Sequence, residues 1–235
     1  MSLLDLFRQV TLSDTLALVW FVLGWWGYAA FARRRAVTGR GSLLATTNRF
    51  RRLWMMQTTA RENRVIDGVV VQNLSTSPSF FASTTILIIG GLLALLGATE
   101  EAAKVVKEIP FAARTSPFVF DLKLFVLAAV FVYAFFRFTW SMRQYTFGAL
   151  LIASAPDPKA FESGEASREE FADRAGRVVG LAAETFNDGL RAYYMAFAVI
   201  LWFFSPLAFA LGTAGIIYLL YQREFRSEVL DVLRQ

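Results

Sequence analysis

The 235-residue sequence contains no cysteine and no histidine. Without these side chains, disulfide bonds, thiolate metal sites and His-ligated haem or zinc are excluded. A Ser-His-Asp or Cys-His nucleophile is excluded for the same reason. We therefore expect no metal and no cofactor. Charged residues are also scarce: they make up 18% of the chain, against about 25% in average soluble domains.

Hydrophobic residues make up 56% of the chain and gather in long runs. A bilayer core of about 30 Å needs roughly 20 apolar residues in a helix. Such runs cover about residues 15–32, 80–97, 122–140 and 192–221. The sequence therefore predicts an all-α fold, a single membrane domain with about four transmembrane helices and amphipathic cytoplasmic helices.

The last apolar run is too long for one upright helix and too short for two spans. It contains Pro206, which removes a backbone hydrogen bond and kinks a helix interior. We interpret the run as one kinked or tilted helix. A re-entrant hairpin around Ser205 and Pro206 is the alternative.

The distribution of positive charge predicts the orientation, because loops rich in Lys and Arg stay on the cytoplasmic side. Segment 33–79 holds nine arginines and two acids, and segment 141–191 is also rich in positive charge. Loop 98–121 and the N-terminus hold far fewer. We therefore expect segments 33–79 and 141–191 to be cytoplasmic and both termini to lie outside. A re-entrant last run would instead place the C-terminal tail inside.

Both cytoplasmic segments contain helical patterns. From Phe50 to Leu74, apolar residues recur at nearly helical spacing, which predicts a long amphipathic helix that re-enters the protein before Pro78. Residues 154–170 are polar and contain Pro and Gly, so we expect an exposed linker there. From Phe171 a helix should run into the last span.

Arg137 is the most informative residue of the third span. An Arg at bilayer depth costs about 2.5–3.5 kcal/mol on insertion scales. Its face carries small and polar side chains, namely Val130, Ala134, Ser141, Gln144 and Gly148. Two interpretations stay open: an ion pair with an acid at similar depth, or part of a pathway for a solute or ion. We expect the Arg137 guanidinium to contact Glu62, Asp67, Glu184 or Asp188.

The candidate pathway or ion-pair cluster combines polar residues from three segments at similar predicted depth. Its members are Arg61, Glu62, Asn63, Arg64, Asp67, Arg137, Arg143, Glu184, Asp188 and Arg191. On the helix that starts at Phe171, Glu184 and Asp188 repel each other as an i, i+4 pair, and Arg191 relieves this. A hard cation between these two carboxylates is the less favoured interpretation, because no further ligands are specified.

Two further patterns predict contacts with other helices and with lipid. Small residues follow one face of the second span at Ser83, Gly90, Ala94 and Gly97, which is typical of close helix packing. We expect Pro206 to take part in helix packing as well. The run Arg33, Arg34 and Arg35 should lie among anionic lipid headgroups.

Several blocks of the sequence resemble one family closely. They are residues 52–74 (RLWMMQTTARENRVIDGVVVQNL), 79–96, 138–156 (FTWSMRQYTFGALLIASAP), 174–206 and 221–227. These blocks resemble the bacterial membrane proteins of domain-of-unknown-function family 599. The resemblance implies a multi-pass membrane protein and assigns no activity. Thr146 stands where the family pattern has Asn, so no role of that Asn carries over to this chain.

These features suggest two classes of function. The first is a homo-oligomeric channel or facilitator for an anion or small solute in the bacterial inner membrane. The second is a non-catalytic structural or accessory subunit of a larger membrane complex. No catalytic spacing is visible, so we expect no enzyme, and we expect no nucleic-acid partner.

Overall fold

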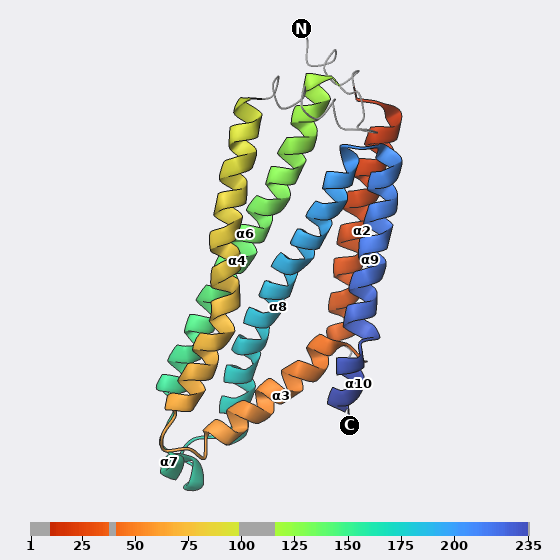
Figure 1. Cartoon of the computed structure of the whole chain (residues 1–235). Coiled ribbons are helices and arrows are strands. Elements are labelled where there is room, and N and C mark those ends of the chain that lie inside the picture. The colour runs from red at the N-terminus through yellow and green to blue at the C-terminus, as the bar shows by residue number, and fades with distance from the viewer. Residues whose placement is uncertain (1–9, 38–40, 99–115, 235) are drawn as a thin grey trace. The chain divides into compact units, whose positions relative to one another are not determined.

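The computed structural model describes residues 10–37, 41–98 and 116–234, and every regular element in these ranges is a helix (Figure 1). The helices are α2 (Leu12–Val37), α3 (Leu43–Thr58), α4 (Val65–Gly97), α6 (Pro117–Ala153), α7 (Pro158–Glu162), α8 (Arg168–Trp202), α9 (Pro206–Phe225) and α10 (Glu228–Arg234). The all-α class predicted from the sequence is confirmed.

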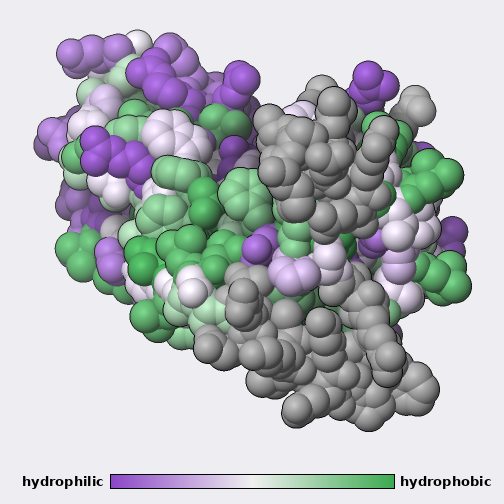
Figure 2. All heavy atoms as spheres, turned by 90° about the horizontal axis from the view of Figure 1, so that it is seen from above, coloured by the Kyte–Doolittle hydropathy of each residue, from purple (hydrophilic) through white to green (hydrophobic). Residues whose placement is uncertain are grey.

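Three of these helices are long and apolar enough to cross a membrane. They cover Leu12–Arg35, Val65–Gly97 and Pro117–Ala153. Many of their large apolar side chains point outward, and hydrophobic residues form much of the surface that is visible in Figure 2. An exposed apolar surface of this extent is typical of a protein surrounded by lipid. The fourth expected span, 192–221, is not among the candidates within the described residues.

Segment 33–79, which was expected to be cytoplasmic, differs from the prediction of one long amphipathic helix that re-enters the protein before Pro78. Helix α3 ends at Thr58, a turn follows, and α4 begins at Val65 and continues through Pro78. The α4 helix tolerates Pro78 at the loss of one backbone hydrogen bond. The second candidate span therefore begins at Val65, well before residue 80.

The expected linker 154–170 is only partly exposed. It contains the short helix α7, in which Phe161 is buried with its ring 5.8 Å from that of Phe171. Helix α8 begins at Arg168, three residues before the predicted start. Ser167 explains this start, because its hydroxyl accepts a hydrogen bond from the backbone N–H of Glu170 at 3.2 Å.

The prediction of one kinked helix over 192–221 is wrong. Helix α8 ends at Trp202, and α9 begins at Pro206 after a short turn. Proline suits the first helical position, and the Ser205 hydroxyl accepts from the N–H of Ala208 at 3.0 Å. The two helices pack antiparallel: a Cβ on Gly212 would lie 2.5 Å from Leu201 Cδ1. Near the other end of this hairpin, Arg223 lies 5.2 Å from the ring of Tyr194.

The chain divides into two compact units. Unit 1 comprises Met1–Arg34, Thr84–Ala134 and Leu190–Arg223, and unit 2 comprises Arg35–Ser83, Phe135–Gly189 and Glu224–Gln235. Helices α4, α6 and α8 contribute residues to both units.

In unit 1, α2 and α9 lie side by side and run in the same direction (Figure 1). The indole N–H of Trp20 donates to the carbonyl of Ala210 at 3.2 Å, and the Phe31 ring lies 6.4 Å from that of Tyr221. The interval between the two contacts is eleven residues on both helices, so α2 and α9 are parallel over this length. If α2 crosses the membrane, α9 crosses the same depth in the same direction. This arrangement favours termini on opposite sides, whereas the expectation that both lie outside stays a prediction.

Unit 2 has its core between α3, α4, α6 and α8. The buried side chains of this core are Met55, Val71, Tyr145, Ile152, Ala172, Ala175, Val179 and Ala182. Glycines on α8 let α3 approach closely: a Cβ on Gly176 would lie 3.0 Å from the Cα of Arg52. Arg52 also pairs with Asp173 of α8, which raises the pKa of Arg52. Burial lowers the pKa of the neighbouring Arg51.

The C-terminal helix α10 packs against α3 in unit 2. Just before it, the Glu224 carboxylate accepts a hydrogen bond from the backbone N–H of Leu44 at 3.2 Å. The C-terminal tail therefore lies beside the arginine-rich segment that contains α3, as the re-entrant alternative required.

Candidate functional site

Arg137 of α6 forms an ion pair with Asp188 of α8 in unit 2. The Asp188 side chain is 4% exposed and that of Arg137 is 28% exposed. The structure thus brings Arg137 together with one of the four acids expected from the sequence. Because opposite charges meet here, the cost of burying each one is partly offset.

The polar stripe that follows Arg137 along α6 faces α8. The Ser141 hydroxyl donates to the carbonyl of Ala182 at 2.8 Å. A Cβ on Gly148 would lie 2.9 Å from Val179 Cγ2, so the helices are in close contact here. Two polar atoms of this stripe, Arg137 Nε and Gln144 Oε1, are buried and have no hydrogen-bond partner within the described residues. Such atoms ordinarily pair with water or a polar ligand.

Asp67 forms a second buried polar cluster, at the start of α4. One of its carboxylate oxygens accepts from the indole N–H of Trp54 at 2.6 Å and from the Thr58 hydroxyl at 3.2 Å. The same oxygen pairs with Arg61. The other oxygen, Oδ2, is buried without a partner among the described residues. Asp67 therefore ties the end of α3 to the start of α4, and it does not contact Arg137.

The other residues predicted near Asp67 belong to the turn between α3 and α4. Arg64 donates to the carbonyls of Ala155 at 2.7 Å and Pro156 at 2.5 Å, which holds this turn against the end of α6. The Asn63 side chain accepts from the N–H of Val65 at 3.0 Å and so caps α4. Glu62 is exposed.

The remaining members of the predicted cluster are dispersed. Arg143 is exposed and lies 5.4 Å from the ring of Phe147. Glu184 is half-buried on α8. Arg191 belongs to unit 1, where it is buried with its guanidinium 5.9 Å from the ring of Tyr28. The predicted cluster is thus several separate contacts, of which the Arg137–Asp188 pair is one.

The small-residue stripe of α4 does not pack within the described chain. Ser83, Gly90, Ala94 and Gly97 are all exposed, and a Cβ on Gly90 or Gly97 would meet nothing within 4 Å. Pro206 is the first residue of α9, so its role is to start a helix. Arg33, Arg34 and Arg35 are exposed near the end of α2.

Sequence reasoning missed a buried cluster in unit 1. Lys123 of α6 is 1% exposed, and its ammonium donates to the carbonyl of Trp202 at 2.9 Å. The ammonium also lies 4.0 Å from the carboxylate of Asp14, which accepts from the Trp202 indole N–H at 2.7 Å. The sequence held a signal for this cluster, because a lysine in an apolar helix needs a partner and Asp14 stands at the start of the first span.

Comparison with known proteins decides the family. The family described as "Protein of unknown function, DUF599" matches residues 16–229. This chain is a DUF599 protein. The resemblance seen in the sequence blocks is thereby confirmed, and the DUF599 match includes α3, α4, α6, α8 and α9. No curated protein and no solved structure matches this DUF599 chain.

Proposed function

We propose that this protein is a facilitator for a small polar solute or ion, and that its path follows the stripe between α6 and α8. The observation that supports this is the pair of buried polar atoms without partners, Arg137 Nε and Gln144 Oε1, on one face of α6. The two residues are seven positions apart, which is two helical turns or about 10 Å. A row of buried donors and acceptors over this length is suited to a file of water or a polar solute.

The charge at this stripe bears on the substrate class. An isolated Arg137 would favour anions, but the Asp188 carboxylate compensates its charge. A compensated pair holds a dipole and no net charge, so it favours a neutral polar solute or a solute that carries both charges. An anion would have to compete with Asp188 for the guanidinium.

The direct test is transport by purified protein in liposomes. Water, small polar solutes such as urea and glycerol, and small anions form a suitable panel, with empty liposomes as the blank. We expect flux of at least one neutral polar solute above the blank. Absence of flux for the whole panel in liposomes with verified protein content would overturn the proposal.

The second candidate is an accessory subunit of a larger membrane assembly. The outward face of α4 favours it, because small residues with no partner in the described chain allow another helix to approach closely. In the most apolar part of α4, only 17% of the residues are buried. Extraction in mild detergent discriminates: co-migration with other chains supports this candidate, whereas migration alone or as a homo-oligomer contradicts it. A homo-oligomer is also what the facilitator needs if one copy does not enclose the path.

Under both candidates the protein acts without catalysis. The setting we propose is the bacterial inner membrane, with the start of α2 outside and the arginine-rich segment inside. The support is the unequal distribution of positive charge about the apolar helices.

A further inference from the structure

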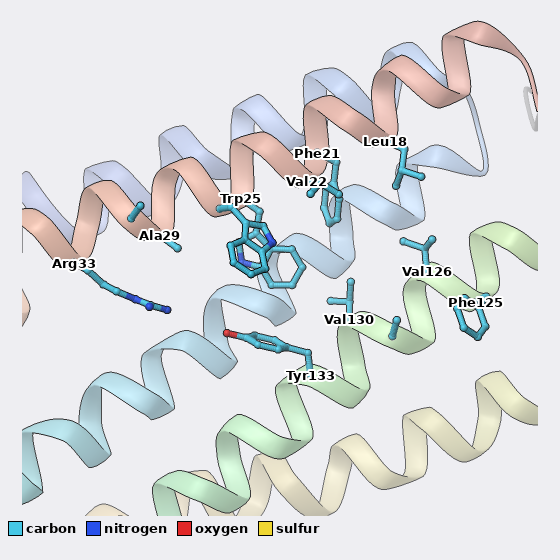
Figure 3. A pocket seen from close by; sticks show the side chains of 13 residues that line it. Leu18, Phe21, Val22, Trp25, Ala29, Arg33, Phe125, Val126, Val130 and Tyr133 are labelled. Carbon is cyan, nitrogen blue, oxygen red and sulfur yellow. The ribbon is translucent and has the colours of Figure 1, made fainter.

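A groove of about 510 Å³ lies between α2 and α6 in unit 1 (Figure 3). Its floor includes the buried side chains of Phe21 and Val130, and its rims include the exposed side chains of Trp26 and Phe125. The residues that line it run from Leu18 to Arg33 along α2, which is about 22 Å of helix. One leaflet of the hydrocarbon core is only about 15 Å deep. The groove is therefore long enough for an acyl chain.

A charged group and a hydroxyl lie toward one end of the groove. Of the described residues that line it, Arg33 alone carries a charge. In Figure 3 the guanidinium of Arg33 reaches into the space between the helices, and the Tyr133 hydroxyl points toward the same end. The Tyr133 ring is braced by Trp25 at 5.6 Å in an edge-to-face contact. An apolar slot with a cation and a hydroxyl at one end complements an amphiphile with an anionic head.

We propose that this groove binds one anionic glycerophospholipid of the bilayer, with an acyl chain along α2 and α6 and its phosphate at Arg33. An arginine matches phosphate in charge and in its fork of N–H donors. Arg33 begins the run of three arginines that ends the apolar part of α2, which is the depth at which headgroups lie. General lipid contact needs only an apolar surface, whereas this site discriminates between headgroups through one residue.

Native mass spectrometry on the purified full chain tests the site. The protein is incubated with phosphatidylglycerol or with phosphatidylcholine of the same chains, and retained lipid is counted. Wild type should retain one phosphatidylglycerol in preference to phosphatidylcholine. Arg33→Gln should lower that preference about fivefold. Arg34→Gln is the matched control, because Arg34 is exposed on the same turn and does not line the groove; it should leave the preference within about twofold of wild type.

A second variant tests the acyl-chain part of the site separately. Ala129 lines the groove and is exposed, so Ala129→Trp should fill the slot without disturbing the core. We expect this variant to retain neither phosphatidylglycerol nor phosphatidylcholine. The proposal is wrong if wild type retains the two lipids equally, if Arg33→Gln and Arg34→Gln behave alike, or if Ala129→Trp retains lipid as wild type does.

Discussion

The Arg137 guanidinium on α6 and the buried Asp188 carboxylate on α8 form a partly buried ion pair between residues that are 51 positions apart in the chain. Removing Asp188 takes the ion-pair partner from the Arg137 guanidinium in a medium that solvates charge poorly. Asp188→Ala should cost about 3 kcal/mol, because a guanidinium cannot give up its proton. Arg137→Leu should cost less, because Asp188 keeps a further interaction. Thermal unfolding in detergent measures both.

The double variant Arg137→Leu/Asp188→Leu is the control for this pair. It should be more stable than Asp188→Ala alone, since it leaves no Arg137 guanidinium without its ion-pair partner. Equal stability of Asp188→Ala and wild type would show that the pair is not formed in the membrane protein.

The second prediction concerns the buried Lys123–Asp14–Trp202 cluster of unit 1. Asp14→Ala leaves the Lys123 ammonium with the Trp202 carbonyl and removes the acceptor of the Trp202 indole. We expect a loss of about 3 kcal/mol, and partial recovery in Asp14→Ala/Lys123→Met. Thermal unfolding followed by tryptophan fluorescence checks this, since Trp202 is itself part of the cluster. An Asp14→Ala variant as stable as wild type would contradict the cluster.

The third prediction compares two glycines. A Cβ on Gly189 would lie 2.4 Å from the Phe138 ring, and Phe138 is fully buried. Gly189→Ala should therefore destabilise unit 2 by about 1–3 kcal/mol. Gly90→Ala is the matched control, because nothing lies within 4 Å of that position. It should be neutral or stabilising, since alanine favours helix by up to about 1 kcal/mol. If Gly189→Ala and Gly90→Ala unfolded at the same temperature, the close packing of Gly189 on Phe138 would be contradicted.

The fourth prediction concerns topology, and the absence of cysteine makes wild type a blank for thiol labelling. Glu62→Cys and Val232→Cys, both at exposed positions, should label from the cytoplasmic side. Leu12→Cys, at the exposed start of α2, should label from the outside. The reason is that α2 and α9 run parallel while α10 packs on α3. Labelling of Leu12→Cys and Val232→Cys from one side would refute the parallel arrangement.

The sequence was sufficient for the helical class and for the existence of three long apolar helices, because run length and the cost of burying charge determine them, but it did not predict that the second begins at Val65. The sequence also predicts that Arg137 pairs with a carboxylate, because few acids lie at its depth. The choice of Asp188 over Asp67 depends on how α3 and α4 meet at Trp54 and Thr58, which is a tertiary contact.

The errors also have physical causes. Pro206 can kink a helix or start one, and local pattern does not distinguish these roles; packing of Gly212 on Leu201 favours the hairpin. Pro78 lies within α4 because the apolar run on both sides stabilises the helix more than one lost hydrogen bond costs. The Lys123 cluster is not predicted from the sequence because the partners of Lys123, Asp14 and Trp202, are distant from it in the chain.

Flux through the Gln144→Leu variant tests the facilitator proposal most directly. Removing a buried polar atom that has no described partner should leave thermal stability equal or higher. Thr146→Val is the matched control, since Thr146 is exposed on the same helix and its hydroxyl donates to its own helix at Met142. We expect Gln144→Leu to lower solute flux in liposomes about tenfold at unchanged stability, while Thr146→Val conducts as wild type. Equal flux in wild type, Gln144→Leu and Thr146→Val would contradict it.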